Sequence, residues 1–363
     1  MNLEMMEDHS HQAVWDGYLN NLPRYLIGLS RYLQSSTMHT LCDELGYRDL
    51  KINYEPFFAL VGRDGCRLTE LADWLAISKQ SCNRTANQIK KVGYLEDKPD
   101  PSDGRAKILV MTKKGISMVT EASNVSLELE NSFKIKLGSK NYSKLLEIIR
   151  QIYNSLNMPK FRVDMSRTEA QTGLLVSLLP RVSDYFMQAL MEETKQRGHV
   201  GLKMSHGQVL SLIGLSGGRI QQIAKIQDVS KQAISAIAKE LKNLGYIQQS
   251  RDSCDGRGVV LMFTDKGLGL ISDSVVSVKI VEKQLSDILG QRDLLVLKKI
   301  SKDLYQSLHL EEEVFSPRLS NLSLVADESL NALAITLRHE LGEKVVRALG
   351  QLLITTQSGK TFK

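Results

Sequence analysis

The sequence carries one pattern twice, with the second copy 152 residues after the first (230 − 78 = 152). No gap is needed to keep the matching motifs at this offset. They are Ser78-Lys79-Gln80 with Ser230-Lys231-Gln232, Gly93-Tyr94 with Gly245-Tyr246, and Asp103-Gly104-Arg105 with Asp255-Gly256-Arg257. A period this long indicates a duplicated domain rather than a solenoid of short repeats. We therefore expect one domain at 1–158, a second at 161–310 and a helical extension at 311–363.

The composition is that of a soluble globular protein with a mild excess of positive charge. Of the 363 residues, 42% are hydrophobic and 24% are charged, and the formal net charge is +6. Residues 46–119 and 198–271 each carry a net charge of about +4, so the excess lies in the repeated segments. This distribution suits a polyanionic partner without requiring one.

The sequence does not have the features of a membrane, secreted or metal-binding protein. No apolar run approaches the length of about 18 residues that a membrane span needs. The first residues lack the basic start and apolar centre of a signal peptide. The four cysteines, Cys42, Cys66, Cys82 and Cys254, form no CxxC pair and have no histidine at metal-ligand spacing. We expect a cytoplasmic protein with reduced thiols, no metal and no cofactor.

Four stretches, 12–45, 120–156, 167–197 and 268–309, have apolar residues at every third or fourth position and predict long helices. Pro23 is expected to kink the first of them, and Leu179-Pro180-Arg181 resembles Leu22-Pro23-Arg24. These helices are too long for one small module to cover. Packing them together would make a pseudo-dimer within one chain, although each half could instead pair with another chain.

Between the long helices, each copy predicts short helices followed by a hairpin. In the first copy the helices are expected near 53–62, 68–76 and 79–92, with a turn at 99–104 between two strands and a final helix from Thr112 to about 156, in one or two pieces. In the second they are expected near 205–213, 219–227 and 231–244, with a hairpin at 246–263 and a last helix at 265–309. Two short helices and a hairpin with a basic tip make a winged helix-turn-helix. The predicted fold is mainly α, with two such domains on a shared core of long helices related by a pseudo-two-fold axis.

The helix of each copy that follows the Ser-Lys-Gln motif is expected to read DNA, because an α-helix fits the major groove. Ser78 and Ser230 are expected to cap these helices, and Cys82 to lie in the apolar stripe of the first. The proposed DNA-binding residues of the two helices are Ser78, Lys79, Gln80, Ser81, Asn83, Arg84, Asn87, Ser230, Lys231, Gln232, Ser235 and Lys239. The second copy has Ala236 at the position of Arg84 and Ser235 at that of Asn83, so it should read fewer bases or different ones.

In this pattern the sequence resembles the MarR family of transcription regulators, in a fused tandem form. The residues that carry the resemblance in the first copy are Leu68 to Ala72, Ser78, Gly93-Tyr94-Leu95, Asp100 to Arg105, and Thr112 to Gly115. In the second copy they are Ile223-Ala224, Ser230, Gly245-Tyr246-Ile247, Asp252 to Arg257, and Thr264 to Gly267. The resemblance covers about 12–156 and 167–309, and the 311–363 extension lies outside it.

The resemblance implies a dimer of winged modules that binds double-stranded DNA at a pseudo-palindromic operator, with the first and last helices of each module at the interface. It also implies that Arg105 and Arg257 of the wings enter the minor groove, steadied by a nearby aspartate, for which Asp103 and Asp255 are the candidates. A small-molecule effector between the long helices and each DNA-binding lobe is a further implication. The fusion makes the two halves unequal, so the operator need not be a strict palindrome.

Two other functions fit the same sequence. A plasmid replication initiator can also carry two winged-helix domains, and an interaction scaffold could keep the fold without binding DNA. An enzyme is not expected, because the sequence lacks a Gly-Lys-Ser/Thr phosphate loop, a Gly-x-Ser-x-Gly elbow and a His-Glu-x-x-His motif.

Overall fold

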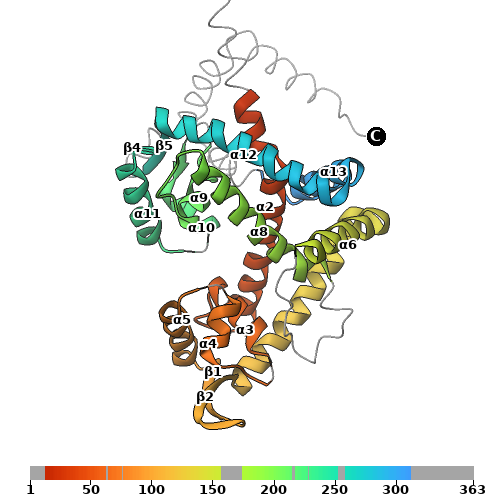
Figure 1. The fold of residues 1–363 in the computed structure, drawn as a ribbon, viewed down its shortest axis with the longest axis vertical. Coiled ribbons are helices and arrows are strands. Elements are labelled where there is room, and N and C mark those ends of the chain that lie inside the picture. Colours follow the sequence, from red (N-terminus) through yellow and green to blue (C-terminus); the bar gives the residue numbers. More distant parts are fainter. Residues whose placement is uncertain are drawn as a thin grey trace, which may run out of the picture. The chain divides into compact units, whose positions relative to one another are not determined.

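The computed structural model describes residues 13–311, apart from 63, 76, 157–173, 215–216, 228 and 252–257 (Figure 1). The boundary expected between the two copies at 158–161, and the helical extension expected at 311–363, lie outside the described residues except for Glu311.

The start of the first copy differs from the single helix predicted over 12–45. Residues 13–19 are helical, and α2 (Leu22–His39) begins after Asn21, whose side chain accepts a hydrogen bond from the Arg24 N–H at 2.9 Å. A π-helix at Thr40–Glu44 follows. Pro23 does not kink a continuous helix: the helix is interrupted at Asn20 and Asn21, and Pro23 lies in the first turn of α2, where a missing N–H leaves no bond unmade.

The first module has the predicted order of elements. After a 3₁₀ turn at Ile52–Tyr54 come α3 (Glu55–Val61), α4 (Leu68–Trp74), α5 (Lys79–Lys91), β1 (Leu95–Asp100), β2 (Asp103–Met111) and α6 (Lys113–Ser155). The antiparallel strands extend into the turn predicted at 99–104, so only Pro101 and Ser102 separate them. Inside α6, Gly138 has φ +71° and divides the helix in two.

The second copy repeats this order with one more strand. It contains α8 (Leu175–Gln196), α9 (Met204–Leu210), β3 (Gly218–Arg219), α10 (Ile220–Ile226), α11 (Lys231–Asn243), β4 (Ile247–Arg251), β5 (Val259–Phe263), α12 (Asp265–Leu289) and α13 (Gln291–Ser307). The three strands form a sheet in the order β3-β5-β4.

Two sequence interpretations of the second copy need correction. The single helix predicted at 265–309 is broken at Gly290, which has φ +79° and stands 152 residues after Gly138. Pro180 lies inside α8, whereas Pro23 begins α2. These prolines are 157 residues apart rather than 152, so they do not occupy equivalent positions of the repeat. The similarity of the two Leu-Pro-Arg tripeptides therefore does not reflect a shared structural role.

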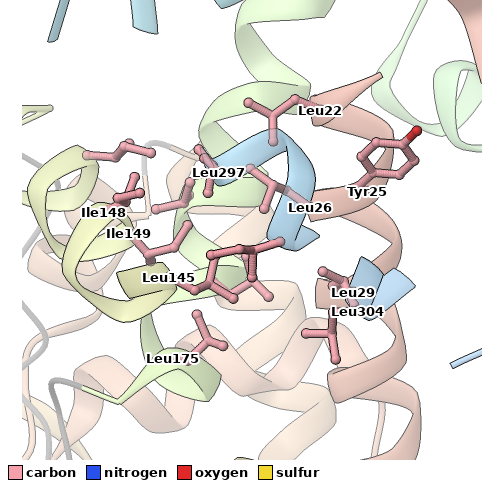
Figure 2. Packing of buried hydrophobic residues seen from close by; sticks show 14 of the residues in the cluster. Leu22, Tyr25, Leu26, Leu29, Leu145, Ile148, Ile149, Leu175, Leu297 and Leu304 are labelled. Atoms are coloured by element: carbon pink, nitrogen blue, oxygen red, sulfur yellow. The ribbon is translucent and has the colours of Figure 1, made fainter. Parts of the chain in front are cut away.

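The long helices of both copies share one hydrophobic core. Buried residues of α2 and α6 pack in the same cluster as those of α8, α12 and α13. Figure 2 shows side chains of this cluster from three helices: Leu26 and Leu29 from α2, Leu145 and Ile149 from α6, and Leu297 and Leu304 from α13. Each winged module has a separate small core of its own, centred on residues such as Ile89 in the first and Leu241 in the second. The central core therefore belongs to neither copy alone.

Two glutamates at the same repeat position tie the copies together at this core. Glu130 of α6 is buried and accepts hydrogen bonds from the N–H groups of Leu175 and Val176, both at 2.9 Å, and from the Tyr142 hydroxyl. Since α8 begins without a side-chain cap of its own, Glu130 provides that cap from the other copy. In the opposite direction, Glu282 of α12 accepts from the Leu22 N–H at 3.4 Å. We name these two contacts the crossed caps.

We expect Glu130→Gln to destabilise the chain by about 1–3 kcal/mol, because an amide oxygen cannot replace both carboxylate oxygens and a buried N–H loses its partner. The measurement is the free energy of unfolding in urea. Glu128→Gln is the matched control, since Glu128 is exposed on the same helix, and its effect should stay within about 0.5 kcal/mol. Equal effects of the two variants would show that the cap contributes nothing.

Candidate nucleic-acid interface

The α5 helix presents an uncharged and basic face outward because its apolar stripe is fully used by the module core. Cys82, Ala86 and Ile89 are completely buried, and burial raises the pKa of the Cys82 thiol. The Ser78 hydroxyl caps the helix by accepting from the Ser81 N–H at 3.1 Å, as predicted. Of the residues predicted to bind DNA in this copy, Ser81 is half-buried. The others on this helix are exposed: Ser78, Lys79, Gln80, Asn83, Arg84 and Asn87.

The α11 helix has the same construction in the second copy. Ile234, Ala238 and Leu241 are buried, and the Ser230 hydroxyl accepts from the Ala233 N–H at 3.1 Å. All five residues predicted to bind DNA here are exposed: Ser230, Lys231, Gln232, Ser235 and Lys239.

One residue of α11 that the sequence analysis missed is Glu240, an acid on an otherwise basic face. Its carboxylate lies 2.6 Å from the Lys203 Nζ and 3.0 Å from the Nε2 of His206, which is buried. Hydrogen bonds from Lys203 and then His206 hold the pKa of Glu240 below its ordinary value. Glu240 stands 152 residues after Gln88, so a comparison of the two copies of the repeat would have identified an acid in place of an amide.

The Thr-x-Lys-Gly motif fixes the C-terminal ends of α5 and α11 against the long helices that follow the hairpins. In the first copy, the Thr112 hydroxyl donates to the Gly93 carbonyl at 2.7 Å and accepts from the Gly115 N–H at 3.1 Å. Lys114 donates to the Val92 carbonyl at 2.9 Å, which satisfies an orphan acceptor at the end of α5. A Cβ on Gly115 would overlap the Tyr94 carbonyl oxygen, so only glycine fits.

The second copy repeats each of these contacts. Thr264 donates to the Gly245 carbonyl at 2.6 Å, and Lys266 donates to the Leu244 carbonyl at 2.7 Å. The Gly267 N–H donates to the Thr264 hydroxyl at 3.2 Å, and a Cβ on Gly267 would meet the Tyr246 carbonyl oxygen. We call this arrangement the C-terminal lock of α5 and of α11.

In the first wing, an ion pair joins the hairpin to the start of the helix-turn-helix. Asp100 of β1 is only 7% exposed and lies 2.6 Å from both the Nε and an Nη of Arg67, the residue before α4. Ser102 donates to the same carboxylate from its hydroxyl and its N–H. Hydrogen bonds from Ser102, followed by that from Arg67, hold the pKa of Asp100 well below its ordinary range. Arg67 therefore positions the wing.

The wing arginines were expected to have an aspartate close by. Asp103 accepts a hydrogen bond from the backbone N–H of Arg105 at 3.1 Å, and both residues are exposed. Among the described residues, the Arg105 guanidinium has no ion pair, so the side chain is not held against the wing. Asp255 and Arg257 lie outside the described residues.

A cavity of about 780 Å³ lies between α2, α8, residues 50–56 of the first module and the second module. Its walls combine methionine and leucine side chains of α8 with polar groups, among them Arg24, Ser30, Asp184 and Thr194. Arg181, also at its wall, bonds both carboxylate oxygens of Glu55 at 2.8 and 2.9 Å and so joins α8 to α3 of the first module. A smaller cavity of about 160 Å³ lies between α2, α3, α6 and the start of α8. In the described part of the chain no helix has the length and hydropathy to cross a membrane.

Comparison with known proteins gives two matches to one family model. The model of the MarR family matches residues 57–106 and, separately, 200–258, which are the two winged modules. Both winged modules are thus similar to the MarR family. Each match falls on one copy of the 152-residue repeat, which is the pattern of a tandem MarR-family regulator.

Individual relatives resemble only part of the chain. The HTH-type transcriptional regulator BilQ of Clostridioides difficile (strain CD3) is 26% identical over 82 residues, which are 23% of this chain and 55% of that protein. The chain thus spans about half the length of this curated relative. Among solved structures, the transcriptional regulator Tm0710 of Thermotoga maritima is 20% identical and covers 38% of this chain and 96% of its own, with a TM-score of 0.27. Overoxidized AbfR bound to DNA is 22% identical and covers 36% of this chain and 85% of its own, with a TM-score of 0.26.

The lock of the second winged module can be tested by two glycines that stand two residues apart. Gly267→Ala should destabilise the chain by about 1–3 kcal/mol, because the new methyl group overlaps the Tyr246 carbonyl. Gly269 lies in the same helix, and a Cβ added there would meet no atom within 4 Å. Gly269→Ala should therefore stabilise the chain by about 0.5–1 kcal/mol. Thermal or urea unfolding measures both. The same sign for the two variants would contradict the lock.

Proposed function

We propose that this chain is a cytoplasmic, sequence-specific, DNA-binding transcription regulator, and that α5 and α11 are its two reading helices. The observation that carries the proposal is the exposed face of α5, on which Lys79, Gln80, Asn83, Arg84 and Asn87 stand without an acid among them. A helix with this face suits the major groove, where amides and cations find base edges and phosphates. The C-terminal locks support the proposal, because they fix both helices on the long-helix core in the same way.

In this proposal one chain is a pseudo-dimer and binds a pseudo-palindromic operator. The shared core supports internal pairing, since helices of both copies bury one cluster and the crossed caps run in both directions. Two reading helices that serve successive major grooves on one face of DNA must lie about 34–36 Å apart. The domain boundaries 1–158 and 161–310 are part of the same proposal. The rival arrangement, in which each half pairs with another chain, would bind two chains per operator.

The wings are proposed to reach the minor groove through Arg105 and Arg257. For Arg105, exposure and a guanidinium without an ion pair among the described residues support this role, because the side chain is available to a new partner. The Arg67–Asp100 pair would hold the hairpin in place while Arg105 inserts. A small ligand in the cavity of about 780 Å³ would relieve DNA binding by displacing the second module from the core.

Selection of bound fragments from the host genome by the full chain tests the proposed function. We expect a small set of fragments that share one motif, bound with an affinity that falls steeply with salt, since each phosphate contact releases counterions. Enrichment of repeated origin sites would favour a replication initiator. If no fragment were retained even at low salt, the proposal would be overturned, and the result would favour an interaction scaffold that has the fold but does not bind DNA.

Arg105→Ala should weaken operator binding by about 1–3 kcal/mol, the range of a single base contact, because the wing loses its minor-groove side chain. Fluorescence anisotropy with a labelled operator measures the change. Lys140→Ala is the control: Lys140 is exposed on the α6 segment after Gly138 and carries the same charge, but it is far from any reading element in the proposal. Equal losses in both variants would mean that only net charge matters and would remove the wing from the interface.

A further inference from the structure

We propose that the two reading helices have different tasks: α5 discriminates bases, whereas α11 mainly holds the DNA backbone. The operator should then have one strict half-site and one tolerant half-site. This inference rests on the proposed function and concerns the division of specificity between the two helices.

The positions that follow the shared entry motif carry base-reading side chains in α5. Asn83, Arg84 and Asn87 are all exposed there. An arginine can bond guanine through two atoms, and an asparagine can do the same with adenine. The Asn87 amide donates to the Asn83 side-chain oxygen at 3.3 Å, which orients both groups. The Arg84 guanidinium has no hydrogen bond or ion pair with any described residue, so it can engage a base without first losing a partner.

The equivalent positions of α11 are Ser235, Ala236 and Lys239, which are equally exposed. Alanine offers a methyl group and no hydrogen bond. Lysine is a flexible point charge that suits a phosphate, and it lacks the planar fork with which arginine recognises a base. The serine hydroxyl bonds bases with little discrimination. At these three positions α11 therefore lacks the paired donors and acceptors that distinguish one base from another.

The difference does not arise from the backbone, because the two helices are built alike. Both have 13 residues, both are capped by a serine hydroxyl at 3.1 Å, and both end in the same C-terminal lock. Both also begin with Lys-Gln, at Lys79-Gln80 and Lys231-Gln232. The shared residues explain how both helices can dock on DNA, and the three exchanged positions decide what each one reads.

Glu240 is consistent with a backbone-holding role for α11. An acid beside Lys239 would repel phosphates, but Lys203 and His206 of the same module hold its carboxylate at 2.6 and 3.0 Å. Their contacts oppose its charge within the module, which leaves Lys231 and Lys239 to face the DNA. In α5 the equivalent residue is the uncharged Gln88, and Asn87 stands where α11 has Lys239.

The test begins with selection from a random duplex library by the wild-type full chain. The proposal expects sequence preference concentrated in one half of the recovered motif, including at least one guanine. Two halves with equal preference would overturn it. Failure to recover any motif, with no duplex retained at low salt, would instead count against the proposed function itself.

Two matched variants then assign the halves. Arg84→Ala should weaken binding of the selected duplex about 10- to 100-fold and flatten the preference at one position of the strict half. Lys239→Ala should weaken the binding of every duplex by the same factor, whatever its sequence. It should also reduce the steepness of the plot of log K against log salt concentration by about 1. A position-specific loss in Lys239→Ala, or a uniform loss in Arg84→Ala, contradicts the division.

A gain-of-function variant completes the test without depending on loss of binding. Ala236→Arg places on α11 the arginine that α5 carries at the equivalent position, Arg84. Because Ala236 is exposed, the substitution leaves the module core unchanged. It should add a new preference within the tolerant half and leave the strict half unchanged. A new preference in neither half would show that the exchanged position does not face the bases and would overturn the proposal.

Discussion

The structure depends on one hydrophobic core that is assembled from long helices of both copies. Each of these helices has an apolar stripe that its own module is too small to cover, and burial of the stripes against one another is the main favourable term. Burial alone does not fix how the helices meet. The crossed caps add direction, because a carboxylate from each copy satisfies backbone N–H groups at the start of a helix from the other.

The C-terminal locks connect the central core to the exposed helices α5 and α11. A threonine, a lysine and a glycine join the end of a reading helix to the first turn of the long helix that enters the core. The orientation of α5 is therefore set by α6, and that of α11 by α12. A change in how the long helices pack can therefore reach α5 and α11 through these hydrogen bonds. The large cavity beside α2 and α8 lies where such a change could begin.

The sequence predicted the modules well because their residues interact over short distances along the chain. Serine caps, apolar stripes and hairpin turns each depend on neighbours within a few positions, and the constant offset doubled every signal. Gly138 and Gly290 were missed as breaks even though they obey that offset. The prolines misled, because Pro23 and Pro180 look alike in their tripeptides but stand out of register. Contacts such as Arg67–Asp100 and Lys203–Glu240 join residues more than 30 positions apart, and nothing in either local sequence indicates the partner.

Covalent fusion changes what a single mutation can do. In a symmetric homodimer every substitution is made twice, so a regulator and its target site must alter both halves together. Here each module has its own codons, and a substitution in α11 leaves α5 as it was. In the proposed two-headed arrangement, natural selection could adjust one half of the binding site at a time, and such a chain could serve promoters that have no dyad symmetry.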